Sequence, residues 1–130
     1  MKKLFSLLSL VSLLLANGVQ WQKDLRTTAQ AAKESNKKVM ILMSSEHCRY
    51  CKQMHQEVFS NPAIADYINQ HFVSLELDVN NDAYPDALDV RGVPATFFFS
   101  SNLQTRYEKI LGPRHPMMFM HILESIAKQP

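Results

Sequence analysis

The chain contains two cysteines, Cys48 and Cys51, separated by two residues. They follow the apolar run 39–43 and precede a segment, 52–59, whose composition predicts a helix. Unpaired backbone N–H groups and the positive end of the dipole favour a thiolate where a helix begins. Cys48 can then attack a disulfide, and Cys51, one helical turn later, can resolve the mixed disulfide. The spacing therefore predicts a redox-active dithiol.

Two other uses of this cysteine pair have to be weighed. A structural disulfide across two residues closes a very small loop, so it would remove little entropy from the unfolded chain. A metal site is an alternative of another class, with Cys48, Cys51 and His55 as three ligands of an ion such as zinc. No second cysteine pair exists to complete a structural zinc site, so we expect neither a metal nor another cofactor.

The N-terminus has the pattern of a targeting segment. Met1-Lys2-Lys3 is positively charged, and the Leu-rich, uncharged stretch 4–16 has the length of a signal-peptide core. That stretch is shorter than the roughly 20 apolar residues that a transmembrane helix needs. We therefore expect a signal peptide, or an N-terminal anchor, at 1–16 and one domain at 17–130, in a periplasmic or secreted protein.

The charge balance gives no reason to expect a polyanionic partner, either nucleic acid or an anionic membrane. The chain has 14 basic and 12 acidic residues, and loss of Lys2 and Lys3 with the leader leaves 14 − 2 = 12 basic residues. A net charge near zero without a basic cluster gives no reason to expect nucleic acid as a partner.

The remaining pattern predicts the elements that would position the cysteines. Segment 38–44 is apolar on both faces, as in a central strand, whereas 72–79 alternates and predicts a strand with one apolar face. Helices are expected at 24–34, 52–59 and 62–70, helical turns within 84–90, and strands at 95–99 and 106–111. A last amphipathic helix is expected to use Met117, Met118, His121, Ile122 and Ile126. This order predicts an α/β domain, a mixed sheet with helices on both faces.

Two motifs in this order, Cys48-x-x-Cys51 after the first strand and Gly92-Val93-Pro94 before the third, resemble the thioredoxin fold. Segments 51–62 and 78–83 are similar to exported thioredoxin-like reductases such as the C-terminal periplasmic domain of DsbD. The resemblance implies that Cys48 attacks, that Cys51 resolves, and that Pro94 is a cis-proline beside them, with Val93 exposing its backbone to substrate. It also implies disulfide-containing client proteins and a membrane thiol electron donor as partners.

Several positions depart from that family pattern or could adjust the site. His47 replaces a usual tryptophan, and Leu42 stands where many members carry a buried acid, so the proton of Cys51 would need another acceptor, such as Glu46, His47 or water. Val93 resembles the oxidase DsbA, which keeps an oxidase or isomerase as the alternative function.

Three side chains next to Cys48 are further candidates. His47 and Arg49 could lower the thiol pKa of Cys48 by their positive charge. Tyr50, between the two cysteines, could pack against substrate.

Overall fold

The computed structural model of the chain describes residues 18–130; the expected leader at 1–16 lies outside these residues. A four-stranded sheet with the order β2-β1-β3-β4 forms the centre. Strand β1 (Lys38–Ser44) pairs in parallel with β2 (Phe72–Asp78) and antiparallel with β3 (Ala95–Phe99), which pairs antiparallel with β4 (Arg106–Leu111). The predicted mixed sheet is therefore confirmed.

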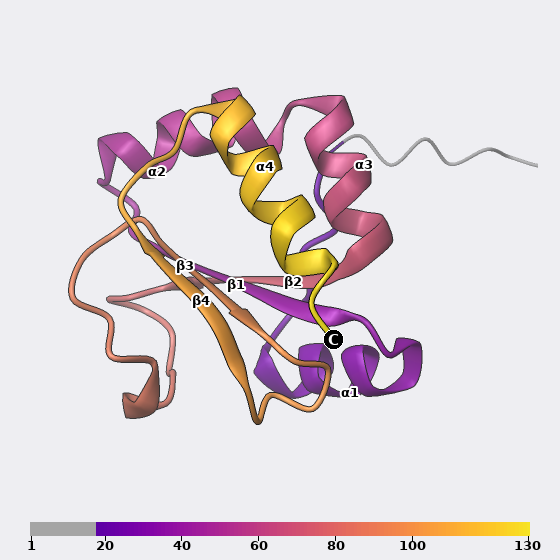
Figure 1. Cartoon of the computed structure of the whole chain (residues 1–130). Helices are drawn as coiled ribbons and strands as arrows, with labels where there is room; N and C mark the ends of the chain where they lie inside the picture. The colour runs from indigo at the N-terminus through magenta and orange to yellow at the C-terminus, as the bar shows by residue number, and fades with distance from the viewer. Residues whose placement is uncertain (1–17) are drawn as a thin grey trace, which may run out of the picture.

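Helices cover both faces of this sheet (Figure 1). Helix α2 (Arg49–Met54), its π-helical continuation η1 (His55–Phe59), α3 (Pro62–His71) and α4 (Pro116–Ala127) lie on one face. Helix α1 (Leu25–Ser35) lies on the other face. The predicted order of helices and strands is confirmed, and none of the helices in the described part of the chain is long and apolar enough to cross a membrane.

The side chains of β1 alternate between two hydrophobic cores, which is why this strand is apolar throughout. Met40 and Leu42 pack with Phe98 and Phe119 beneath α2, α3 and α4. The other core, on the face of α1, contains Val39, Ile41, Met43, Phe97 and Ala32.

Strand β2 differs from its prediction. The apolar residues Val73, Leu75 and Leu77 are buried as expected, but Phe72 and Ser74 on the opposite face are buried as well. The strand therefore has both faces covered near its start, because α3 and α4 pack over the face that alternation assigned to solvent.

The apolar face predicted for the last helix is correct only in part, since Ile126 is buried and Ile122 packs against the core but the two methionines do not. Phe119, Leu123 and Ile126 are buried, whereas Met117 is 76% and Met118 53% exposed. The aromatic ring of Phe119 packs edge-on against Phe59 and near Phe98, so the most voluminous side chain of α4 faces the core. Several apolar stripes run along this helix, and tertiary packing decides which one is buried.

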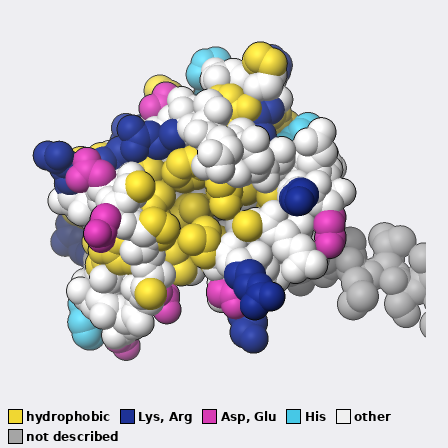
Figure 2. Space-filling model, turned by 90° about the horizontal axis from the view of Figure 1, so that it is seen from below, with side chains coloured by type: hydrophobic (Ala, Val, Ile, Leu, Met, Phe, Trp, Pro, Cys, Tyr) yellow, Lys and Arg dark blue, Asp and Glu magenta, His cyan; other side chains and the backbone are white. Residues whose placement is uncertain are grey.

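The predicted helical turns within 84–90 are reduced to a 3₁₀ turn, η2 (Asp86–Leu88). Next to it, on the face of α1, is an apolar cavity of about 220 Å³, bordered by Leu25, Ile41, Leu88, Phe99 and Leu103 among others. Figure 2, which views the molecule from below, shows hydrophobic side chains gathered in a hollow of this face.

Helix α3 begins where the Asn-Pro pair predicted. The Oδ1 atom of Asn61 accepts hydrogen bonds from the backbone N–H groups of Ala63 (3.0 Å) and Ile64 (3.3 Å), and Pro62 occupies the first turn. We expect Asn61→Ala to lower the free energy of unfolding by about 1 kcal/mol, because two N–H groups lose their partner. Urea denaturation measures this loss. Asn61→Ser, which keeps a capping oxygen, is the control and should lose less than Asn61→Ala.

Candidate active site

The two cysteines form a disulfide at the start of α2, with their Cα atoms 5.2 Å apart. Cys48 is the N-cap residue, so the helix begins at Arg49 and not at Lys52 as predicted. The backbone N–H of Cys51 donates a hydrogen bond to Sγ of Cys48 at 3.1 Å. This N–H group and the helix dipole stabilise negative charge on Cys48 once the disulfide is reduced.

Burial distinguishes the two sulfur-bearing residues. Cys48 is half-buried at the surface, whereas Cys51 is 3% exposed and belongs to the inner face of α2 with Met54 and Val58. An incoming disulfide can reach Cys48 but not Cys51. The arrangement therefore suits attack by Cys48 and resolution by Cys51.

The Gly-Val-Pro segment lies at the same end of the sheet as the cysteines. Ala95, directly after Pro94, pairs with Met43 near the end of β1, and β1 leads into the cysteine loop. The Val93–Pro94 peptide bond is cis, Pro94 is buried, and its carbonyl accepts a hydrogen bond from the N–H of Gly112. Val93 is half-buried.

The other predicted site residues lie on the outer surface of the cysteine loop. His47, Arg49 and Tyr50 are exposed. The guanidinium of Arg49 lies 5.3 Å from the centre of the Tyr50 ring, so these two side chains contact each other. At the same end of the sheet, Leu111 at the end of β4 is 51% exposed. Tyr50, Val93 and Leu111 thus place partly exposed apolar surface at the end of the sheet that carries the disulfide.

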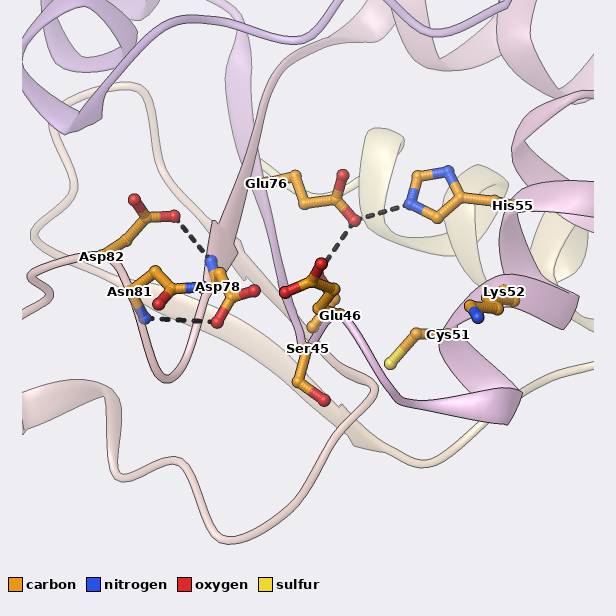
Figure 3. A pocket seen from close by; sticks show the side chains of 10 residues that line it. Ser45, Glu46, Cys51, Lys52, His55, Glu76, Asp78, Asn81 and Asp82 are labelled. Carbon is orange, nitrogen blue, oxygen red and sulfur yellow. Dashed lines mark hydrogen bonds and ion pairs between the residues drawn. The ribbon is translucent and has the colours of Figure 1, made fainter.

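A water-accessible pocket of about 400 Å³ lies on the inner side of the disulfide. Its lining includes Cys51 and His55 from the cysteine helix and Glu76 from β2, and Figure 3 shows these side chains around it. Oε2 of Glu76 accepts hydrogen bonds from Nε2 of His55 at 2.6 Å and from Oγ of Ser44 at 3.0 Å. A carboxylate and an imidazole are thereby joined beside the buried cysteine.

The hydrogen bond to Glu76 raises the pKa of His55 above its ordinary value, while partial burial of the imidazole acts in the opposite direction. The paired carboxylate stabilises the imidazolium, and this is the larger of the two effects. His55 therefore holds a proton at a higher pH than an isolated histidine does.

Sequence reasoning missed Glu76 and considered His55 only as a metal ligand. One signal was present: Glu76 is an acidic residue within a strand whose neighbours are mostly apolar. Its proximity to His55, 21 residues earlier in the chain, depends on the pairing of β2 with β1 and could not be read from spacing.

The structure does not support the metal alternative. Within residues 18–130, no three His, Cys, Asp or Glu side chains are placed to hold an ion together. His55, the proposed third ligand, is hydrogen-bonded to Glu76 instead.

The hydrogen-bonded pair of His55 and Glu76 predicts that the stability of the protein depends on pH. The pKa of His55 is higher in the folded protein than in the unfolded chain, where it is about 6.5. The pair therefore contributes fully to the free energy of unfolding below about pH 6.5, and this contribution is lost as pH rises through the folded pKa. We expect the free energy of unfolding to fall over this window, and to fall less in Glu76→Gln. Urea denaturation between pH 5.5 and 8.5 measures the difference. Equal slopes in the two proteins would contradict the assignment.

Comparison with known proteins agrees with this geometry. A family model described as a thioredoxin-like domain matches residues 25–127. Spermatogenesis-associated protein 20 of Rattus norvegicus is 29% identical over 80 residues, which cover 62% of this chain. An uncharacterised protein of Caenorhabditis elegans is 31% identical over 62 residues, covering 48% of this chain. The aligned segments span only 10% of the rat protein and 8% of the C. elegans protein.

Solved structures share the fold. A thioredoxin from Thermus thermophilus superposes with a TM-score of 0.73 at 23% identity, covering 85% of this chain and 88% of its own. DsbH oxidoreductase gives a TM-score of 0.72 at 15% identity, covering 87% of both chains. The C-terminal domain of DsbD from Neisseria meningitidis gives 0.61 at 20% identity, covering 82% of this chain and 98% of its own. At these identities the likeness establishes the fold.

Proposed function

This chain belongs to the thioredoxin-like domain family, and we propose that it is an exported reductase of protein disulfides. The Cys48–Cys51 pair on this fold supports thiol–disulfide oxidoreductase activity. The observation that carries the proposal is the placement of the two cysteines. Cys48 caps a helix with a backbone N–H directed at its sulfur, and Cys51 is buried behind it.

The reaction follows from that placement. In the dithiol form, the Cys48 thiolate attacks one sulfur of a client disulfide, and the other client sulfur leaves as a thiolate that takes up a proton. Cys51 then loses its proton and attacks Sγ of Cys48. The bond between Cys48 and the client breaks, the second client thiol is released, and the Cys48–Cys51 disulfide remains. The client gains two electrons and two protons, which the dithiol loses.

Two similarities favour the reducing direction. The sequence of segments 51–62 and 78–83 resembles exported reductases, and the fold is shared with the DsbD C-terminal domain. A reductase has to be reduced again after each turnover. We therefore propose a membrane thiol protein as the electron donor and disulfide-bearing exported proteins as clients.

Redox titration against glutathione tests the direction. Reduction potentials are about −270 mV for thioredoxin and about −120 mV for DsbA, a difference of roughly 7 kcal/mol for two electrons. We expect a value near that of thioredoxin. A value near that of DsbA would contradict a reductase, and failure of the pair to cycle at all would contradict thiol exchange.

Two residues, His47 and Val93, favour the alternative, an oxidase or isomerase. His47 is exposed beside Cys48 and Val93 precedes the proline, as the sequence suggested. If His47 stabilises the Cys48 thiolate, it favours the dithiol and makes the disulfide more oxidising. A large shift of the potential in His47→Ala towards that of thioredoxin would support this alternative.

The proposal that the protein is exported rests on the sequence of its expected leader. Its positive start and its apolar stretch at 4–16 are typical of a signal peptide or an anchor. Expression of the full chain in a bacterial host, followed by cell fractionation, tests this. Recovery of the protein in the cytoplasm with its leader intact would contradict it.

A further inference from the structure

We propose that the hydrogen-bonded pair of His55 and Glu76, whose carboxylate also accepts from Ser44, receives the proton that Cys51 must release before it attacks the mixed disulfide. The proposal rests on the thiol-exchange chemistry above and adds the proton pathway on the inner side of the disulfide. Leu42, at the position where many similar proteins carry a buried acid, is 0% exposed and apolar. The proton of Cys51 therefore needs an acceptor elsewhere.

The sheet places a carboxylate next to Leu42. Leu42 and Glu76 are direct partners in the parallel pairing of β1 and β2, so their side chains emerge on the same face of the sheet. That face is the one covered by the cysteine helix. The carboxylate is thus provided by the neighbouring strand instead of the strand that leads to the cysteines.

The helix places His55 beside Cys51. The backbone N–H of His55 bonds to the carbonyl of Cys51, so the two residues are one turn apart on the same helix face. At His55 the helix changes to a π-helical turn, a feature that is frequent at functional sites. The imidazole also packs edge-on against Trp21, with ring centres 5.9 Å apart, which fixes its orientation toward Glu76.

The hydrogen-bond pattern shows how the pair can hold a proton. The Glu76 carboxylate only accepts, so Nε2 of His55 must carry a hydrogen and Nδ1 is free to take a second one. The side chains of His55 and Glu76 are 38% and 29% exposed, so both communicate with the pocket. The pocket has room for water between Cys51 and the pair.

The proton balance is complete. Above the raised pKa of His55, where the imidazole is neutral, the Cys51 thiol gives its proton through water to the pair, which changes from carboxylate and imidazole to carboxylate and imidazolium. The resulting thiolate attacks Sγ of Cys48, and the client sulfur leaves with the electron pair of the broken bond. The departing thiolate is then protonated from solvent, and the pair returns its proton to solvent.

Four other charged groups line the pocket and have to be considered. Asp78 accepts hydrogen bonds from the N–H groups of Asn80 and Asn81, and Asp82 accepts one from the N–H of Asp78, so both stabilise the turn after β2. Lys52 is exposed at the pocket edge and cannot accept a proton while charged.

Glu46 is the alternative acceptor for the proton of Cys51, and it is exposed on the loop before Cys48.

The experiment separates the two chemical steps. Reduced protein is mixed with oxidised glutathione, the reaction is quenched with acid, and the Cys48–glutathione intermediate is followed by mass spectrometry. Attack by Cys48 is measured alone in a Cys51→Ser background. We expect Glu76→Gln and His55→Gln to slow resolution by about 10²-fold near pH 7, within the range of general base catalysis, and to leave attack unchanged. The deficit should shrink as pH rises and Cys51 ionises without help.

Controls and a second readout distinguish proton transfer from a structural role. Glu57→Gln, an exposed carboxamide substitution on the same helix, should resolve at the wild-type rate. The imidazole signals of His55, followed by NMR, should titrate at a different pH in the dithiol and disulfide forms, because the pair shares its proton with Cys51. A purely structural pair would titrate identically in both forms.

The outcomes are distinct. Resolution rates of Glu76→Gln and His55→Gln within twofold of wild type at every pH would overturn the inference, as would slow resolution in Glu46→Gln alone. Loss of the attack step in the Cys51→Ser background would instead contradict the proposed function. Circular dichroism of each variant shows whether it is folded.

Discussion

Replacing Cys48 with serine is expected to abolish disulfide exchange. In an assay of insulin disulfide reduction with dithiothreitol as the electron donor, the catalysed rate should fall by more than about 10³-fold. Cys48 is the cysteine that a client can reach, and it has the backbone N–H of Cys51 directed at its sulfur. A hydroxyl at this position is a far weaker nucleophile than a thiolate. Cys51, at 3% exposure, cannot take over the attack.

Cys51→Ser is the matched control, since it removes the same disulfide and differs only in which sulfur remains. We expect it to attack a client disulfide normally and then to accumulate as a mixed disulfide through Cys48. Mass spectrometry of the trapped species after non-reducing electrophoresis identifies the bond. A Cys48→Ser protein that still exchanges disulfides, or a Cys51→Ser protein that traps nothing, would contradict the division of roles.

The second large effect concerns stability. Phe98 lies on β3 and is 0% exposed, with its ring packed edge-on against Phe72 at 5.5 Å and near Phe119. We expect Phe98→Ala to lower the free energy of unfolding by about 3–5 kcal/mol, because the lost burial adds to the cost of the cavity that remains. Total stabilities are roughly 5–15 kcal/mol, so this loss is a large fraction of the total.

Chemical denaturation monitored by the single tryptophan, Trp21, measures this change. Met117→Ala is the control, because it also shortens a large apolar side chain but at a position that is 76% exposed. Its effect should stay within about 0.5 kcal/mol. Similar losses in the two variants would show that Phe98 is not the core residue that the fold implies.

The order of the elements could be predicted because each depends on local patterns. The apolar run at 38–44 predicted β1, and Asn61-Pro62 predicted the start of α3, where the Asn61 side chain caps two N–H groups. The two cysteines and the Gly-Val-Pro motif predicted the fold through family resemblance. None of these inferences needs knowledge of which segments meet in space.

The buried faces of helices and the residues at which helices begin were harder to predict. The last helix carries several apolar residues at helical spacing, and the sequence pointed to Met117 and Met118, whereas Phe119 is the residue at the core. The start of α2 was placed three residues late, because the cap there is a cysteine and not one of the usual capping side chains.

The sequence by itself determined the chemistry: a cysteine pair with a two-residue spacer before a helix is a redox site wherever the fold carries it. Only the tertiary structure decided which groups serve that pair. The parallel pairing of β1 with β2 brings Glu76 next to Leu42 and opposite His55. Such contacts join residues far apart in the chain, and their geometry is set by strand register and helix packing, which local sequence patterns do not specify.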